Sequence, residues 1–285
     1  VGMQVRSRTA TPYSQRLLEK TRLNPFQLFQ TSLRITQAVL VFFIISYLIW
    51  SGAQAMEYKW QWYRVQPFFY RVIDNEVILG PLVRGLIQTL KLAAISGVIA
   101  IAIGFITAFA RLSSSSAGRI CSKLYLESIR NTPLLVQLFL FYFVLAPIFD
   151  IDRFWAAVLC LSFFEGSFAA EIIRGGIVGV DKGQFESADA IGLNLFDKYR
   201  FIVVPQSLPL ILPPLTGLLI SLIKHSAIVS VIAVSELTTA GLNLISDTFM
   251  AFEIWFIVAG IYLVITITLS ICVSLFELSL NKSKI

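Results

Sequence analysis

Charged residues, histidine and closely spaced cysteines are scarce in this 285-residue sequence. Only 14% of the residues are Asp, Glu, Lys or Arg, whereas soluble domains carry about a quarter. The single histidine, His225, argues against a histidine-based metal site. The three cysteines share no CxxC spacing, and Cys160 and Cys272 fall inside apolar runs. We therefore expect Cys160 and Cys272 to be small buried hydrophobic residues rather than disulfide partners or metal ligands.

Apolar residues dominate what is present. They make up 56% of the chain, its mean hydropathy is +0.77, and several apolar runs are about as long as a membrane is thick. These features predict an all-α polytopic membrane protein between an N-terminal arm (1–32) and a short tail (280–285). The six expected spans are Leu33–Gly52, Pro81–Ala110, Ser122–Ile148, Phe154–Ile173, Ser207–Leu237 and Phe249–Leu278.

The positive charge is concentrated in alternate loops. Excess Lys and Arg mark cytoplasmic loops, so this distribution predicts that both termini are cytoplasmic. It also accounts for the net charge of +6 without a nucleic-acid partner. The predicted cytoplasmic segments contain Arg6, Arg8, Arg16, Lys20, Arg22, Arg34, Arg111, Arg119, Lys123, Arg174, Lys182, Lys198, Arg200, Lys282 and Lys284, and the opposite loops only Lys59, Arg64, Arg71 and Arg153.

The one sizeable external segment lies at about 53–80 and contains YKWQWYRVQPFFYRVI. Alternating aromatic and basic residues are typical of a helix that lies at the membrane interface. Such a segment forms an aromatic belt or contacts an external partner, and it is too short to be a solute-binding domain.

A polar, charged stretch, ESADAIGLNLFDKYRFIVVP (Glu186–Pro205), interrupts the apolar sequence on the predicted cytoplasmic side. Residues 183–199 can form a helix-turn-helix, with turns at Gly183 and Gly192. Asn194 or Asp197 would cap the second helix. Such a structure suits docking into a groove on a partner. The alternative is an ordinary connecting loop, although functionless loops of this length are uncommon.

The spacing Glu-Ser-Ala-x3-Gly-x9-Ile-x-Val-Pro resembles the EAA loop of ATP-binding-cassette (ABC) importer permeases, EAA-x3-G-x9-I-x-LP. Ser187 and Val204 are mild departures. The flanking stretches AAEIIRGGIVGVDKGQFESADAIGL and VVPQSLPLILPPLTGLLISLIKHSAIVSVIAVSEL closely resemble the polar amino acid (histidine/glutamine-type) permease family. YLESIRNTPLLVQLFLFYF in the third span is similar to its upstream motif. The resemblance covers about Gly85–Leu278.

The resemblance implies an ABC type I importer permease core at 81–279 with an extra N-terminal helix. In this family the EAA loop forms coupling helices that sit in a groove of the ATPase. The resemblance therefore implies a set of residues that couple the permease to the ATPase: Gly183, Gln184, Glu186, Ser187, Ala188, Asp189 and Gly192.

The resemblance also implies partners. They are an ABC ATPase dimer, a second permease subunit (the same or a related chain), an external amino-acid-binding protein and a polar amino acid substrate. The location would be the bacterial inner membrane. The chain has no GxxxxGK[ST] phosphate loop. ATP and Mg would therefore be bound by the partner ATPase, and this chain would be a transport subunit without a cofactor, not an enzyme.

Charged residues inside the spans call for partners, because each costs about 2.5–3.5 kcal/mol to insert. Glu127 and Arg130 are three residues apart, as are Glu171 and Arg174. This spacing places each pair on one helix face, and we expect two structural ion pairs near the cytoplasmic ends of their spans.

Glu165 lies near the middle of the fourth span, among small residues that permit close packing or line a cavity. It either binds the ammonium group or cationic side chain of a substrate, or is a protonated carboxyl group that hydrogen-bonds a neighbouring helix. Gln137 in the third span either lines the pathway or forms an interhelical hydrogen bond.

The fifth expected span would be about 46 Å long if fully helical, whereas the hydrocarbon core of the membrane is about 30 Å thick. Pro209, Pro213 and Pro214 remove backbone donors near its cytoplasmic end, so we expect a tilted or broken helix. Lys224, His225 and Ser226 would lie well inside it and line the substrate pathway. Lys224 could instead be a helix-packing counterion for Glu165 or another acidic residue. His225 departs from the acidic form of the family's pattern.

Two rival functions remain at this stage. One is an autonomous ion-coupled secondary transporter, in which Glu165, Lys224 and His225 form an ion site. The other is a non-transporting membrane scaffold or sensor whose cytoplasmic loop recruits an ATPase.

Overall fold

A computed structural model describes residues 25–56 and 58–282 and divides the chain into two units, 1–60 and 61–285. Most of the predicted arm and part of the tail therefore lie outside the described residues. The first unit contains one long helix, α2 (Pro25–Ala55). Within it, Leu33–Gly52 is long and apolar enough to cross a membrane, as the sequence predicts.

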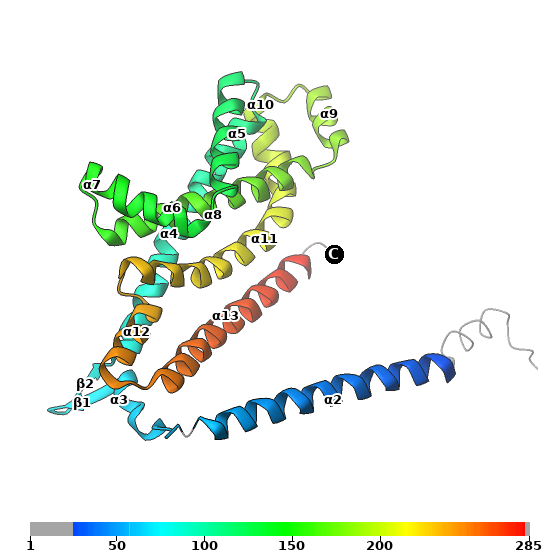
Figure 1. Cartoon of the computed structure of the whole chain (residues 1–285). Coiled ribbons are helices and arrows are strands. Elements are labelled where there is room, and N and C mark those ends of the chain that lie inside the picture. Colours follow the sequence, from blue (N-terminus) through cyan, green and yellow to red (C-terminus); the bar gives the residue numbers. More distant parts are fainter. Residues whose placement is uncertain (1–24, 57, 283–285) are drawn as a thin grey trace, which may run out of the picture. The chain divides into compact units, whose positions relative to one another are not determined.

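The second unit is mostly helical, which confirms the predicted fold class except for one short hairpin (Figure 1). Its four long helices are α4 (Pro81–Leu112), α8 (Arg153–Val178), α11 (Val204–His225) and α13 (Ala251–Lys282). The shorter elements are η1 (Trp62–Arg64), α3 (Gln66–Phe69), α5 (Ser116–Arg130), α6 (Leu134–Phe139), η2 (Leu140–Leu145), α7 (Ala146–Phe149), α9 (Lys182–Ala190), α10 (Leu195–Lys198), η3 (Tyr199–Val203), η4 (Ser226–Ile232) and α12 (Leu237–Thr248).

The described residues contain five helices that can cross a membrane, or six spans when one bent pair counts as a single span. That pair replaces the expected single helix at Ser122–Ile148. Its two arms, Ser116–Arg130 and Leu134–Phe149, meet at 105°. The bend falls at Pro133, whose ring disfavours helical geometry in the preceding residue.

The segment at 53–80, which is predicted to be external, is not the interfacial helix that its aromatic and basic residues predict. After α3 it forms an antiparallel hairpin of β1 (Tyr70–Ile73) and β2 (Glu76–Leu79). Asp74 and Asn75 both have positive φ, 51° and 65°. This is the geometry of a two-residue hairpin turn, which Asp and Asn tolerate better than other non-glycine residues. Turn chemistry and β-branched neighbours therefore override the aromatic pattern.

The fifth span breaks after its prolines, not at them. α11 continues through Pro209, Pro213 and Pro214 to His225. Each proline removes one backbone donor, and the other backbone hydrogen bonds maintain the helix. At Ser226 the helix tightens into the 3₁₀ turn η4, and the chain leaves helical geometry at Ala233, whose φ is 54°. The predicted polar triplet therefore lies at the point where the helix type changes.

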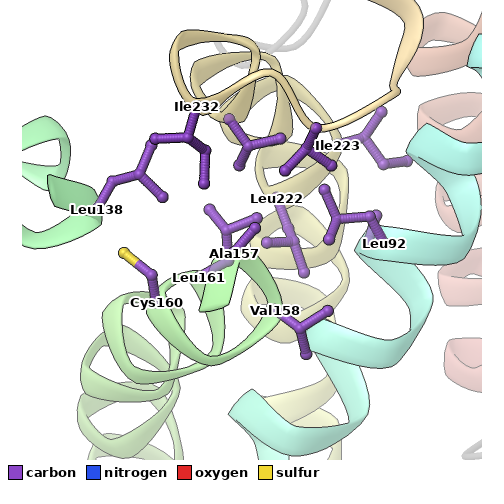
Figure 2. Packing of buried hydrophobic residues seen from close by; sticks show 12 residues of the cluster. Leu92, Leu138, Ala157, Val158, Cys160, Leu161, Leu222, Ile223 and Ile232 are labelled. Atoms are coloured by element: carbon purple, nitrogen blue, oxygen red, sulfur yellow. The ribbon is translucent and has the colours of Figure 1, made fainter. Parts of the chain in front are cut away.

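The main apolar core lies where α4, α8 and α11 meet. Leu92, Val158 and Leu222 pack there with Leu138 and Ile232 (Figure 2). Cys160 is part of this core, as expected. The same expectation is wrong for Cys272, which is exposed on α13. An apolar run in a membrane protein can face lipid, so hydrophobicity alone does not identify a residue buried in protein.

Gly104 allows the backbones of α4 and α8 to approach closely. A Cβ atom at this position would lie 2.7 Å from Cβ of Ala169 and 3.1 Å from its carbonyl carbon. We expect Gly104→Ala to lower the thermal unfolding temperature in detergent, because overpacking costs about 1–3 kcal/mol. Gly260→Ala is the matched control, since nothing lies within 4 Å of its added Cβ. The control should be neutral or slightly stabilising, because alanine favours helix. Equal shifts in the two variants would contradict the close-packing explanation.

Candidate functional site

The polar segment at residues 181–203, which covers most of the stretch predicted to dock a partner (Glu186–Pro205), folds as two short helices that meet at a tight turn. Its first helix, α9, begins after Asp181, whose side chain accepts a hydrogen bond of 2.7 Å from the Gly183 amide. Gly183 therefore lies in the first turn of α9. The prediction that it supplies a turn between helices is wrong.

Gly192 ends α9 in a geometry that favours glycine. Its φ is +77°, the left-handed region that side chains make costly. Its amide donates to the Asp189 carbonyl at 3.0 Å, and the Leu193 amide donates to the Ala188 carbonyl at 3.1 Å. This pair of bonds is the Schellman motif, which satisfies carbonyls at a helix end. The glycine of the EAA-like spacing is therefore required here by the left-handed backbone conformation at the end of α9.

Asn194 caps the second helix, α10, as one of the two predicted alternatives. Its side-chain oxygen accepts a hydrogen bond of 2.9 Å from the Asp197 amide, so Asp197 is not the cap. The two helices are joined by an ion pair between Lys198 and Asp189. The side-chain amide nitrogen of Gln206 donates to the side-chain oxygen of Gln184 at 3.0 Å, and this bond connects α9 to the start of α11. The segment is therefore held together internally and tied to a membrane span.

Most of the predicted coupling residues are on the surface. Glu186, Ser187 and Asp189 are exposed, and the Glu186 side chain makes no hydrogen bond or ion pair with another described residue. Ala188 differs, because it is fully buried within the chain. A direct contact between Ala188 and a partner does not fit this arrangement. Its small side chain instead lets α9 pack against its own protein.

Inside the membrane region, Glu165 and His225 form a close pair. Glu165 lies on α8 and His225 at the last position of α11, and Glu165 Oε1 is 2.5 Å from His225 Nδ1. The Glu165 side chain is only 3% exposed, whereas that of His225 is 43% exposed. The imidazole also meets the Phe164 ring edge-on at 5.9 Å. Glu165 thus has a partner on a neighbouring helix, and the imidazole offers an accessible polar face.

The other predicted pathway residues do not all join this pair. Lys224 is exposed and forms no ion pair with Glu165, so the packing-counterion alternative does not describe this structure. Ser226 is buried, and its hydroxyl donates to the Ile223 carbonyl at 2.7 Å. It therefore helps to end α11 and faces no open path.

Gln137 on α6 is buried, and its amide nitrogen donates to the carbonyls of Ile129 and Thr132 at 2.7 and 2.8 Å. These bonds support the 105° bend between α5 and α6. Its oxygen is the one buried side-chain polar atom among the described residues that has no hydrogen-bond partner. An unpaired buried acceptor is costly, so this atom is available to a donor that the chain itself does not supply.

Only one of the two ion pairs predicted near the cytoplasmic ends of the spans forms in the structure. Glu171 pairs with Arg174 at 3.0 Å as expected, but also with Arg111, and it lies 4.0 Å from Arg130. Glu127 accepts a hydrogen bond of 2.9 Å from Asn131 and does not pair with Arg130. The sequence did not predict Arg111 as an ion-pair partner of Glu171, because the two residues are 60 positions apart and no local spacing reveals their contact.

Glu236 is a second residue that local patterns do not single out. It is completely buried and caps α12, accepting hydrogen bonds from the amides of Thr238 and Thr239 at 2.8 and 2.7 Å. The Tyr262 hydroxyl on α13 donates to it at 3.0 Å. The Leu237 amide donates to Thr89 on α4 at 3.0 Å. These bonds fix the start of α12 between α4 and α13.

Comparisons with known proteins agree with this architecture. Residues 100–282 match the family model described as "Binding-protein-dependent transport system inner membrane component". The glutamine transport system permease protein GlnP of Escherichia coli (strain K12) is 36% identical over 66% of this chain and 88% of its own. The arginine transport system permease protein ArtQ of Bacillus subtilis (strain 168) is 34% identical over 66% of this chain and 87% of its own.

Two solved structures share this fold. A chain from a crystal structure of an amino acid ABC transporter with histidines is 40% identical, has a TM-score of 0.65, and is matched over 69% of this chain and 92% of its own. A chain from an inward-facing MetNI methionine ABC transporter has a TM-score of 0.63 at 17% identity, over 70% of this chain and 95% of its own, and shows the fold alone. The family model covers more than half of the sequence, and the chain therefore belongs to the inner membrane permease components of binding-protein-dependent ABC transport systems.

Proposed function

We propose that this permease forms half of the translocation pathway of an ATP-driven importer for polar amino acids of the glutamine, arginine and histidine class. The observation that carries the proposal is the polar segment 181–203. It presents an exposed, internally braced helix pair, and it runs without interruption into α11, whose last residue meets Glu165. A partner that moves this pair would move the intramembrane residues with it.

The partners follow from this arrangement and from the relatives. An ATPase dimer would receive α9 and α10 and would bind the ATP and Mg, because this chain has no phosphate loop. A second permease subunit, the same or a related chain, would complete the pathway. An external binding protein would deliver the amino acid. The basic loops support an inner-membrane orientation with both termini in the cytoplasm.

The substrate pathway would involve Glu165, His225 and Gln137. The Glu165 carboxylate and the imidazole can bind a cationic or ammonium group, and the unpaired Gln137 oxygen accepts a further donor. Lys224 is exposed close by and would bind a carboxylate. ATP binding would close the ATPase dimer and switch the pathway, and hydrolysis would reset it. The permease itself carries out no covalent chemistry.

Purification from native membranes in mild detergent, followed by mass identification of bound chains, tests this proposal. We expect an ATPase to copurify, together with a second permease chain if the pathway is heterodimeric. Proteoliposomes of that complex, with the binding protein added, should accumulate amino acids only when ATP is supplied. Accumulation by the protein alone without ATP would overturn the proposal in favour of an ion-coupled transporter. ATPase binding without any uptake would favour a scaffold.

A further inference from the structure

A polar pocket is lined by the first turns of α4 and by α12 together with the residues just before it. Figure 1 shows α12 beside the start of α4, close to the β1–β2 hairpin. Its volume is about 460 Å³, within the range of small-molecule sites. The two helices touch here because Gly85 has no side chain. A Cβ atom there would lie 2.9 Å from that of Ala240 and 3.0 Å from the Leu237 Cα atom. The predicted pathway residues lie elsewhere, on α6, α8, α11 and the first position of η4.

Each helix contributes two polar side chains four residues apart to this pocket. Arg84 and Gln88 come from α4, and Asn243 and Asp247 from α12. A spacing of four places both members of a pair on one helix face. All four residues are exposed, and none of their side chains makes a hydrogen bond or ion pair with another residue in the described ranges. Their polar groups are therefore available to a ligand.

The base of the pocket offers fewer free hydrogen-bonding groups than its walls. Glu236 and Thr239 line it, but their side-chain oxygens already bond to one another and to α12 amides or the Val234 carbonyl. Recognition must come from the four residues on the walls. They combine one guanidinium, one carboxylate and two primary amides, with no net charge. A phosphorylated ligand would favour excess positive charge, and a lipid chain would favour apolar walls.

We infer that this pocket binds a free zwitterionic amino acid, with Arg84 on its α-carboxylate and Asp247 on its α-ammonium group. Gln88 and Asn243 supply donors and acceptors for its remaining polar atoms. The inference rests on the proposed importer function and deepens it. In the proposed orientation the pocket opens at the outer end of α4, so it is a loading site that receives the amino acid before it reaches Glu165.

A cysteine at the rim reports occupancy. Ser235 is exposed and lines the pocket, but it has no role in the proposed recognition. The whole transporter carrying Ser235→Cys is reconstituted and labelled with a membrane-impermeant maleimide from outside. We expect free glutamine or arginine to slow labelling in the absence of binding protein. The same amino acids should not slow labelling at Asp74→Cys on the hairpin.

Chemical variants of the probe and the protein identify the contacts. The N-acetyl derivative lacks the ammonium group and the amide derivative lacks the carboxylate, so both should protect at least about tenfold more weakly. Arg84→Gln and Asp247→Asn in the Ser235→Cys background should raise the half-protecting concentration about tenfold or more. The matched changes Arg71→Gln and Asp74→Asn, both on the exposed hairpin, should not.

Three outcomes would overturn this inference: no protection by the free amino acid, equal protection at Asp74→Cys, or protection only by the binding protein. The last would make the pocket a protein contact. ATP-driven uptake by the same vesicles is measured in parallel. Loss of uptake in the unmodified complex would refute the proposed function, whereas normal uptake without protection would refute only the loading site.

Discussion

We expect Glu186→Arg to abolish ATP-driven uptake while leaving the permease folded. Glu186 is exposed on α9 and has no partner among the described residues, so the fold loses no contact when it is replaced. A surface that accepts this carboxylate in a groove would instead meet a cation. Leaving charges unpaired at an interface costs about 2–5 kcal/mol, which is at least a 30-fold loss of coupling. The measurements are uptake by proteoliposomes and retention of the ATPase during purification.

Glu76→Arg is the matched control for this change. It makes the same substitution at an exposed position of β2, far in sequence from the polar segment. Uptake and ATPase retention should be unchanged in the control. Normal ATP-driven uptake by Glu186→Arg would mean that α9 does not couple the permease to an ATPase. Loss of both proteins from the membrane would instead indicate misfolding, which thermal unfolding in detergent detects.

The second large effect concerns Glu165→Gln, which should lower uptake at least about tenfold with little change in thermal stability. Glutamine keeps the size of the side chain and can still bond to His225, whose Nδ1 is 2.5 Å from the carboxylate. Only the charge is lost, and a hydrogen bond to a charged group contributes about 1.5–3 kcal/mol. The reduction should be in kcat/KM for substrates that carry a cationic group.

Ser167→Ala is the control within the same helix. Ser167 is buried like Glu165, but its hydroxyl donates to the Phe164 carbonyl of its own helix, so its removal should not change transport. Unchanged uptake and substrate affinity in Glu165→Gln would show that the carboxyl group does not bind substrate. It would then serve as a structural link between α8 and α11.

Local sequence patterns predicted the features that depend on local chemistry. Hydropathy located the spans, and the Asn194 cap and the Gly192 turn followed from residue type and spacing. Features that depend on distant residues could not be predicted in this way. Arg111 meets Glu171 across two helices, and nothing near either residue indicates that contact.

The incorrect predictions arise from contacts between distant residues and from burial, which local sequence patterns do not record. Glu127 and Arg130 share a helix face, but three arginines converge on Glu171 and Asn131 is closer to Glu127. The motif includes Ala188, yet packing buries it. A pattern states which residues are required and not whether each one faces a partner or its own core. The Glu165–His225 pair illustrates the same limit, because sequence nominated both residues but did not pair them with one another, and left Lys224 as one alternative counterion.

The continuity of α10, η3 and α11 sets a constraint on chain length. These elements follow one another without a gap from Leu195 to His225. Each residue of an α-helix turns the chain by about 100°, so one inserted residue within α11 would rotate His225 away from Glu165. η3 is a π-helical turn, the form that a helix takes when it absorbs one extra residue. The rotation of α11 relative to the predicted cytoplasmic helices is therefore set by the number of residues between them. An insertion along this path changes that rotation unless another π-helical turn absorbs it.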